Sequence, residues 1–175
     1  MGSGDAPDWR SLSAAELERR LDGLLGTHGP SLARLAASYV RSAGDRDDLL
    51  QDIAVAIWRA LPRFRGECSE RTFLFRIAHN RGVAYVTRRR LPVVDTGGEL
   101  EIEDARPNPE QALSTEQQGQ HLLDAVQRLP VGHRQVVTLM LEGLSYGEIG
   151  DVLGITETNV GARLTRARQK LRQLL

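Results

Sequence analysis

The chain has 175 residues, 41% of them hydrophobic, with 23 basic and 23 acidic side chains, so it can form one or two small globular domains. Only 5% of residues are aromatic and no long polar–apolar alternation occurs, which favours packed helices over a sheet. The single cysteine excludes an intrachain disulfide, and with no signal peptide or membrane-spanning apolar run we expect a cytoplasmic protein without membrane contact of its own.

The charges are distributed unevenly. Residues 31–90 carry 12 arginines against 6 acidic residues, whereas residues 91–119 carry 7 acidic residues against one arginine. Residues 120–175 are basic again, with 7 basic and 5 acidic residues. Two basic segments separated by an acidic one predict two domains that face a polyanion, with a linker between them.

Residues 1–29 are predicted to be an N-terminal extension. A short amphipathic helix begins near Ser13, and the sequence GTHGP at residues 26–30 is expected to end it. Pro30 suits the first turn of a second helix that extends to Val40. Apolar residues at helical spacing predict the buried sides: Leu17, Leu21 and Leu24 or Leu25 in the first helix, and Leu32, Leu35, Ala36 and Tyr39 in the second.

A third helix is predicted from Asp45 until Pro62 closes it. Its core side is predicted to contain Leu50, Ile53, Ala54, Ile57 and Leu61. The opposite face carries Asp48, Asp52, Val55 and Arg59, flanked by Gln51 and Ala56. Acidic groups beside exposed apolar ones are typical of a protein-binding surface, and a solvated helix face is the alternative.

A basic and polar loop, RFRGECSERT, is predicted at residues 63–72, before a fourth helix at residues 73–90. The inward side of this helix is predicted to contain Phe73, Leu74, Ile77, Ala78 and Val83 or Ala84. The remaining surface offers Arg76, Asn80, Arg81, Tyr85 and the arginines at 88–90. Aromatic rings and arginines beside a loop suit single-stranded bases, because they stack on bases and neutralise phosphates. The alternative is a buried aromatic side with a basic helix end.

Residues 91–119 contain three prolines, two adjacent glycines and no helical period, and are predicted to be a flexible acidic linker. The last domain is predicted from residue 120. Leu122, Leu123, Val126 and Leu129 define one helix that Pro130 ends, and Val136, Val137, Met140 and Leu141 define the next.

Residues 144–171 predict a helix-turn-helix. Ser145 and Glu148 form a capping box at the start of its first helix, of which Ile149, Val152 and Leu153 form the buried side. Gly154 supplies the left-handed conformation that ends this helix, and Thr156 caps the next.

The second helix of this motif has an apolar stripe and a polar, basic face. The stripe is Val160, Leu164, Ala167 and Leu171. The opposite face contains Thr158, Ala162, Thr165, Arg166 and Gln169, flanked by Asn159, Gly161, Arg163 and Arg168. Small polar groups followed by arginines suit a helix that meets base edges and phosphates in a DNA groove, and an ordinary basic surface helix is the alternative.

Five sequence runs in this order resemble an extracytoplasmic-function sigma factor of bacterial RNA polymerase. They are DDLLQDIAVAIWRAL, FRG, TFLFRIAHN, LPVGHRQVVTLMLEGLSYGEIGDVLGIT and NVGARLTRARQKL, and the resemblance covers about residues 31–175. It implies an all-α protein of two small helical domains joined by the acidic linker. A four-helix sigma region 2-like domain at 30–90 would bind the polymerase clamp and open the promoter minus-10 element. A region 4-like domain at 120–175 would read the minus-35 element as duplex.

The resemblance also implies roles for individual residues. The surface that docks on the polymerase clamp would contain Asp48, Gln51, Asp52 and Val55. The loop at residues 64–69 would capture a flipped minus-10 base, and the minus-10 surface would contain Phe64, Arg65, Gly66, Glu67, Cys68, Ser69, Arg76, Ile77, Asn80, Arg81 and Arg88. The minus-35 surface would contain Thr158, Asn159, Gly161, Ala162, Arg163, Thr165, Arg166 and Arg168.

Three departures from the family pattern matter. Phe73 replaces a usual tryptophan, and we expect it to fill a core. Gly161 replaces a usually basic residue, so minus-35 readout would depend more on Arg166 and on DNA shape. The capture loop lacks the usual downstream aromatic residue and has Glu70 in its neighbourhood, so its base preference is open. An acid beside DNA repels phosphate, and such loops discriminate partly in that way.

The implied partners are core RNA polymerase, promoter DNA and an inhibitory anti-sigma factor, with no cofactor or metal. A stand-alone helix-turn-helix regulator is the alternative, but it leaves the helix face around Asp48 without a role. An enzyme is disfavoured, because the histidines at 28, 79, 121 and 133 show no metal-binding spacing and Cys68 has no neighbouring base. With no resolving partner, the Cys68 thiol is expected to be inert.

Overall fold

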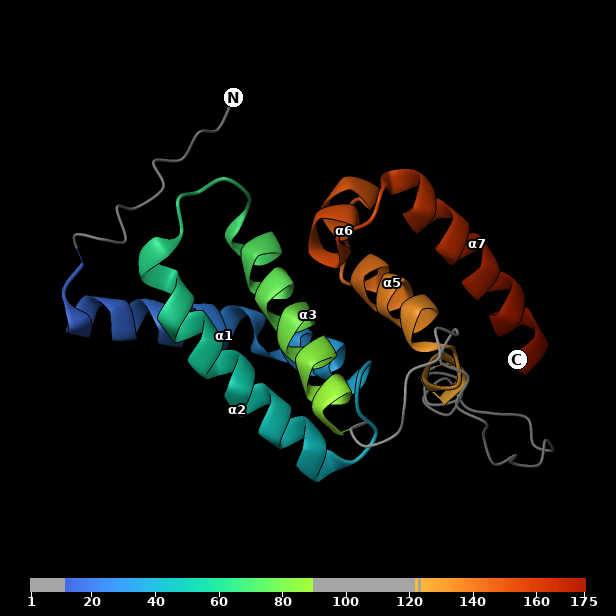
Figure 1. The fold of residues 1–175 in the computed structure, drawn as a ribbon, viewed down its shortest axis with the longest axis horizontal. Coiled ribbons are helices and arrows are strands. Elements are labelled where there is room, and N and C mark those ends of the chain that lie inside the picture. The colour runs from blue at the N-terminus through green and yellow to red at the C-terminus, as the bar shows by residue number, and fades with distance from the viewer. Residues whose placement is uncertain (1–11, 90–121, 123) are drawn as a thin grey trace. The chain divides into compact units, whose positions relative to one another are not determined.

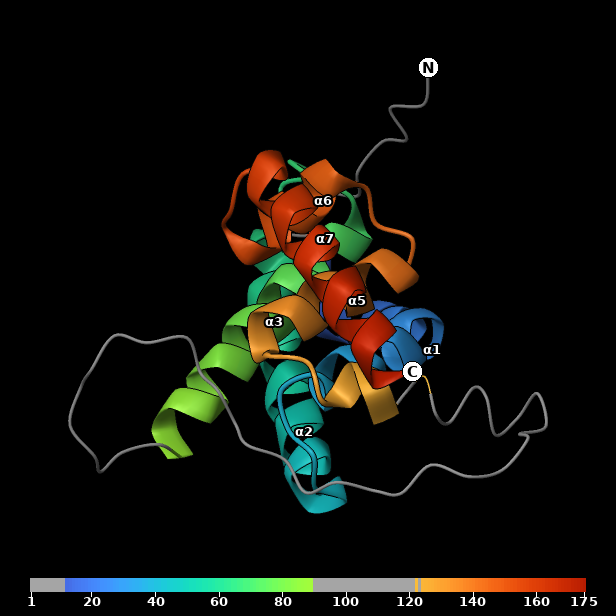
Figure 2. The same cartoon turned by 90° about the vertical axis from the view of Figure 1, so that its right-hand side faces the viewer.

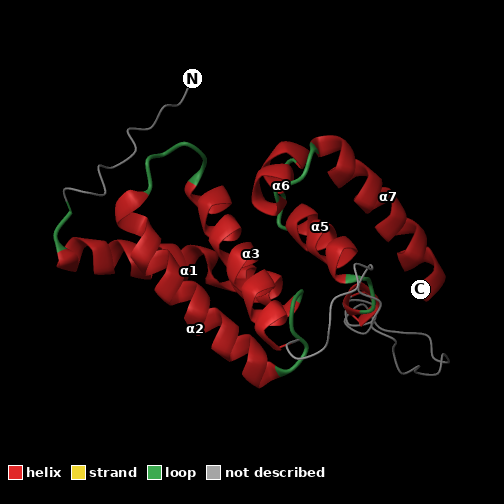
Figure 3. Cartoon of the chain, viewed as in Figure 1, coloured by secondary structure: helices red, strands yellow, loops and turns green. Residues whose placement is uncertain are grey.

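The computed structural model describes residues 12–89, 122 and 124–175, and these contain helices, turns and loops but no strand (Figures 1 and 3). The all-α prediction is therefore confirmed. The chain divides into two compact units, of which the first contains α1 to α3 and the second contains α5, α7 and most of α6. The predicted linker at residues 91–119 and the first eleven residues lie outside the described residues.

One continuous helix, α1 (Ala14–Ala37), replaces the two short helices predicted at the N-terminus. The hydroxyl of Ser13 accepts a hydrogen bond from the backbone of Glu16, whose carboxylate accepts one from the backbone of Ser13. Pro30 lies inside the helix, so the predicted break at residues 26–30 is wrong. Burial along one side outweighs the hydrogen bond that proline removes. The buried leucines of that side are Leu17, Leu24, Leu32 and Leu35.

The second helix, α2 (Ala43–Ala60), begins after the cap Ser42 and continues into the 3-10 turn η1 (Leu61–Arg63). It packs against both α1 and α3 (Figures 1 and 2). Leu50 and Ala54, predicted to face the core, are only half-buried. Two helices, α1 and α3, pack against α2, and the side that they bury is rotated away from these two residues. Its buried residues are Leu49, Ile53, Ala56, Ile57 and Leu61.

The third helix, α3 (Glu70–Arg89), starts three residues earlier than predicted. Its fully buried ring is Phe75, whereas Phe73 and Ile77 are half-buried. Of the two residues predicted as alternatives on the inward side, Val83 is 44% exposed and Ala84 is half-buried. With α1 forming one helix, the described part of this unit has three α-helices and one 3-10 turn rather than four helices.

Tyr39, just beyond the end of α1, joins this helix to α3. A Cβ atom on Gly82 would lie 2.6 to 2.7 Å from the Tyr39 ring, so only glycine allows this close approach. The Tyr39 hydroxyl lies 2.5 Å from Nδ1 of His79, one turn earlier in α3. Burial raises the pKa of Tyr39 above its ordinary value, so the phenol stays protonated in the fold.

The second unit contains helical residues 124–127 and then α5 (Val131–Leu141), most of α6 (Tyr146–Leu153) and α7 (Glu157–Leu174). Helix α5 packs against α7. Leu122 and Leu141 are 40% and 69% exposed, and Leu123 lies outside the described residues. The buried apolar residues include Val126, Leu129, Val136, Val137, Leu139, Ile149, Val152, Val160, Leu164 and Ala167.

Candidate nucleic-acid interfaces

The loop at residues 64–69, called the capture loop below, is held at both ends. The Phe64 ring lies on the Phe73 ring, with centroids 4.4 Å apart and planes at 30°. At the other end, the hydroxyl of Ser69 accepts a hydrogen bond from the backbone N–H of Thr72 at 3.1 Å and caps α3. Gly66 has a φ of 72°, which other residues rarely adopt. Local contacts therefore preform this loop before any ligand binds.

The middle of the capture loop is exposed. Arg65, Gly66 and Glu67 are exposed, and Cys68 is half-buried. Burial raises the pKa of the Cys68 thiol, and the charge of Arg76 opposes this shift without cancelling it. The thiol is thus less ionised at neutral pH than an ordinary cysteine, which agrees with the predicted lack of reactivity.

Helix α3 continues this surface beyond the capture loop. Arg76, Asn80, Arg81 and Arg88 are exposed, while Ile77 is half-buried. Tyr85 was predicted to belong to the same surface. Its hydroxyl instead donates a hydrogen bond to the carboxylate of Asp45 at 3.3 Å and joins α3 to the start of α2.

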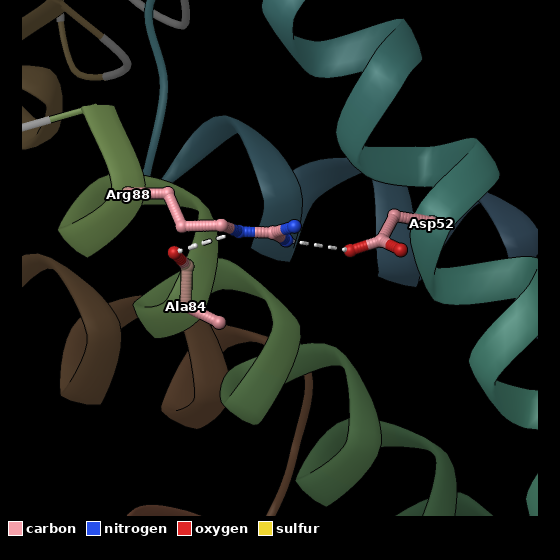
Figure 4. A network of polar contacts seen from close by, with 3 residues as sticks. All are labelled: Asp52, Ala84 and Arg88. Carbon is pink, nitrogen blue, oxygen red and sulfur yellow. Dashed lines mark hydrogen bonds and ion pairs between the residues drawn. The ribbon is translucent and has the colours of Figure 1, made fainter.

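The face of α2 predicted to bind polymerase is open to solvent. Asp48 and Gln51 are exposed, and Val55 is 47% exposed although it is apolar. Asp52 is half-buried because Arg88 of α3 reaches across to it, with Nη2 3.3 Å from Oδ2 (Figure 4). The Nε–H of Arg88 donates to its own helix, at the carbonyl of Ala84. The structure thus joins a residue predicted to contact DNA to one predicted to contact polymerase.

The helix-turn-helix forms as predicted. The hydroxyl of Ser145 caps α6 and the carboxylate of Glu148 accepts from the Ser145 backbone at 2.8 Å, which completes the capping box. Gly154 has a φ of 68°, and the hydroxyl of Thr156 caps α7. A Cβ on Gly150 would lie 2.7 Å from the carbonyl oxygen of Ile155, so glycine allows the turn to pack directly on α6.

The outward side of α7 presents most of the predicted minus-35 residues. Thr158, Asn159, Ala162, Thr165, Arg166 and Arg168 are exposed, while Gly161 and Arg163 are half-buried. The Nε–H of Arg163 donates to Oδ1 of Asn159 at 3.2 Å. Its Nη1 lies 3.3 Å from where a Cβ on Gly132 of α5 would be. Arg163 therefore lies along the start of α5 rather than projecting from α7.

Two further residues lie beside these surfaces and were not predicted to be part of them. A Cβ on Gly161 would meet the ring of Tyr146 at 3.6 Å. The Tyr146 ring of α6 therefore lies beside Gly161, where α7 has no side chain. Arg20 of α1 pairs with Glu70 at the end of the capture loop, with Nη2 3.3 Å from Oε1. Both contacts join separate helices, and no spacing within one helix could indicate them.

Across the ranges 12–89 and 124–175 with residue 122, no cluster of three or more histidine, cysteine, aspartate or glutamate side chains is arranged to hold a metal ion. No helix in these ranges is long and apolar enough to cross a membrane.

Comparison with known sequence families assigns both units. Residues 24–91 match the family described as sigma-70 region 2, and residues 120–171 match sigma-70, region 4. The chain is 33% identical to the RNA polymerase sigma factor CnrH of Cupriavidus metallidurans, over 100% of this chain and 97% of that protein. It is also 33% identical to the ECF RNA polymerase sigma-E factor of Escherichia coli, over 80% of this chain and 78% of that protein.

Solved structures give the same assignment. The structure of CnrH in complex with the cytosolic domain of CnrY has a TM-score of 0.64 and 29% identity, and covers 90% of this chain and 88% of that one. The sigma factor RpoE in complex with the anti-sigma factor NepR, from Bartonella quintana, has a TM-score of 0.71 and 25% identity, with coverages of 89% and 96%. Together, the two units define a sigma factor of the sigma-70 type with regions 2 and 4. The chain belongs to the extracytoplasmic-function sigma factors of bacterial RNA polymerase.

Proposed function

We propose that this chain reads the minus-35 element of its promoters with α7 and opens and holds the minus-10 element with the capture loop and α3. The main supporting observation is that each unit has its own exposed polar and basic surface, of a different kind. One is a capped helix with small polar side chains followed by arginines, which suits duplex DNA. The other is a preformed loop beside aromatic rings and arginines, which suits unpaired bases.

The geometry of α7 divides the minus-35 contacts into two kinds. Thr158, Ala162 and Thr165 are small and exposed, so the helix backbone can approach base edges closely. Arg166 is exposed one turn after Ala162 and is the principal candidate for reading a guanine. We assign Arg163 and Arg168 to phosphates. For Arg163 the reason is its hydrogen bond to Asn159, which keeps its guanidinium beside the start of α5.

The preformed capture loop explains how a base could be held at modest cost. Extruding a base costs a few kcal/mol, and a loop that must also order itself would add to that cost. Phe64 and Ser69 already fix the ends of the loop. We assign Ile77 and Asn80 to the pocket wall and the arginines at 76, 81 and 88 to phosphates.

The same proposal assigns the exposed face of α2 to core polymerase and no catalytic step to this chain. Asp48, Gln51, Asp52 and Val55 combine acidic, amide and apolar groups that fit a protein partner. The solved complexes of CnrH with CnrY and of RpoE with NepR support an anti-sigma factor as a further partner. Since this work is done with polymerase on DNA, we place the chain in the cytoplasm.

Run-off transcription from a promoter library, with core polymerase in the presence and absence of this chain, tests the proposal. We expect initiation at a shared two-part sequence motif only when the chain is present. A variant with Asp48 and Gln51 both replaced by Ala should lose initiation and still bind minus-35 DNA. If nothing initiates while the free protein binds a specific duplex, the stand-alone regulator is correct instead.

A further inference from the structure

The first turns of α1 precede the region that matches sigma-70 region 2, which starts at residue 24. Residues 14–23, called the N-terminal arm below, nevertheless pack against the rest of the first unit, because Leu17 is only 8% exposed, as buried as Leu24 just beyond the arm at 7%. Removing the apolar surface of Leu17 from water stabilises this packing. The arm is therefore part of the folded domain.

Tertiary contacts, rather than helix propensity, hold the arm in position. Gly23, the last residue of the arm, and Gly26 and Gly29, which follow it in α1, each have nothing within 4 Å of a would-be Cβ. Each glycine makes a helix less stable than alanine would, and Pro30 removes one backbone hydrogen bond. Because the helix is intrinsically unstable over this segment, it does not fix the direction of the arm. The tertiary contacts of the arm fix that direction instead.

Arg20 lies on the packed side of the arm. At about 100° per residue it is about 60° from Leu17 around the helix, whereas Arg19 is about 160° away and on the opposite side. The guanidinium of Arg20 reaches the carboxylate of Glu70 at 3.3 Å, across fifty residues of sequence. The Nε–H of Arg19 donates to the carbonyl of Ala15 within its own helix. Of two adjacent arginines of equal charge, one therefore bonds within its own helix and the other pairs with α3.

Glu70 occupies a sensitive position. It is the first residue of α3 and directly follows Ser69, the last residue of the capture loop. A carboxylate is favourable at a helix N-terminus, but beside nucleic acid it repels phosphates. The positive charge of Arg20 offsets that repulsion while leaving Glu70 in place at the start of the helix.

We propose that Arg20 is a positioning residue for promoter opening, through which the N-terminal arm neutralises Glu70 so that the capture loop can approach the minus-10 strand. This inference rests on the proposed function. An exposed ion pair is worth about 0.2 to 1 kcal/mol, which corresponds to about a 1.5- to 5-fold change in binding. The arm thereby becomes part of the minus-10 machinery although it lies outside the matched region.

The test is a double-mutant cycle on the assembled holoenzyme. Its affinity for fork-junction DNA carrying the minus-10 element is measured by fluorescence anisotropy, with DNA taken from the promoter that the run-off library identifies. Arg20→Ala should weaken binding about 2- to 5-fold more than the control Arg19→Ala, which removes the same charge from the other side of the helix. In the background of Glu70→Gln the two arginine variants should be equal. Arg20→Lys should bind within about twofold of the wild type, because it keeps the charge.

Two results would overturn the inference. Arg20→Ala and Arg19→Ala could weaken binding equally, which would reduce Arg20 to general electrostatics. The extra loss in Arg20→Ala could instead persist with Glu70→Gln, which would mean that Arg20 contacts DNA directly or supports the fold. Absence of promoter-dependent binding by the wild-type holoenzyme would overturn the proposed function and this inference together, and the wild-type measurement identifies that case.

Discussion

Arg88 and Asp52, predicted to bind DNA and polymerase respectively, form an ion pair with each other between α3 and α2. Their side chains are 65% and 35% exposed, so water screens the attraction and the pair contributes at most about 1 kcal/mol. If Arg88 turns to a DNA phosphate, or Asp52 to a polymerase group, the ion pair between them breaks. The pair therefore belongs to both proposed surfaces and to the packing of α2 on α3.

The first prediction concerns this pair. Asp52→Asn should lower the free energy of unfolding by less than about 1 kcal/mol, and the difference should shrink as salt is added. Urea unfolding at low and high ionic strength measures both effects. The Asp52→Asn variant should lose more affinity for core polymerase than the Arg88→Ala variant, since only Asp52 lies on the proposed docking face. A loss of stability above about 2 kcal/mol that does not depend on salt would contradict the assignment.

Gly82 offers a sharper test of the fold. Gly82→Ala would push a methyl group into the Tyr39 ring, and overpacking of this kind costs about 1 to 3 kcal/mol. Gly23→Ala is the matched control, because nothing lies within 4 Å of its Cβ position, and it should gain up to about 1 kcal/mol from helix propensity. Thermal unfolding of both variants should give melting temperatures on opposite sides of the wild type. Similar shifts in both would mean that Tyr39 moves aside easily.

Two glycines of the helix-turn-helix should respond in opposite directions. Gly161→Ala places a methyl group at ordinary contact distance from Tyr146 and should stabilise the domain by about 1 kcal/mol with minus-35 affinity kept within about twofold. Gly150→Ala meets a backbone carbonyl at 2.7 Å and should destabilise it by about 1 to 3 kcal/mol. Chemical denaturation and duplex binding of both variants provide the comparison. Equal destabilisation would place Gly161 in tighter packing than the distance indicates.

Arg166 should carry sequence information. Arg166→Ala is expected to cost about 1 to 3 kcal/mol at the preferred minus-35 sequence and to relax the preference at one position. Arg172→Ala, in the last turn of the same helix, should weaken binding to all sequences alike. Binding selections with randomised duplexes distinguish these outcomes. A uniform loss in the Arg166 variant would make it a phosphate contact.

The buried phenol of Tyr39 predicts behaviour in alkali. Its pKa is raised in the folded state, whereas in the unfolded chain it titrates near 10. Below that value both states are protonated and the contribution of Tyr39 to stability is fully present. Above it the unfolded state ionises first, so stability falls by up to about 1.4 kcal/mol per pH unit. Tyr39→Phe should be less stable at pH 7, where it lacks the bond to His79, and should lose less between pH 10 and 11 in urea titrations.

The features that sequence predicted correctly are those fixed by neighbouring residues. Ser145, Glu148, Gly154 and Thr156 begin or end helices through contacts only a few positions away, and the structure places all four as predicted. The inward stripe of α7 also follows from one helix packing on one side. Helix ends that are set by local hydrogen bonds, and a helix that packs on one side only, can be predicted from sequence because distant contacts affect them little.

The errors arise where distant segments decide the outcome. The helix through Pro30 persists because leucines on both sides of it are buried in one domain, which no local signal at residues 26–30 indicates. Phe73, expected to fill the core, packs on Phe64 at the other end of the capture loop, and Phe75 is the phenylalanine buried in the core. The pairs that join Arg88 to Asp52 and Arg20 to Glu70 likewise depend on the tertiary fold.

The frame of the helix-turn-helix has a consequence for how such proteins diverge. Its turn is fixed by Gly150, Gly154 and the cap Thr156, while Thr158, Ala162, Thr165 and Arg166 lie on the exposed side of α7. Substitutions at these exposed positions alter the groups offered to bases without disturbing the turn, because surface changes on a helix usually shift stability by less than about 0.5 kcal/mol. After gene duplication, copies of this domain can therefore acquire separate regulons through a few exposed substitutions, with the fold conserved throughout.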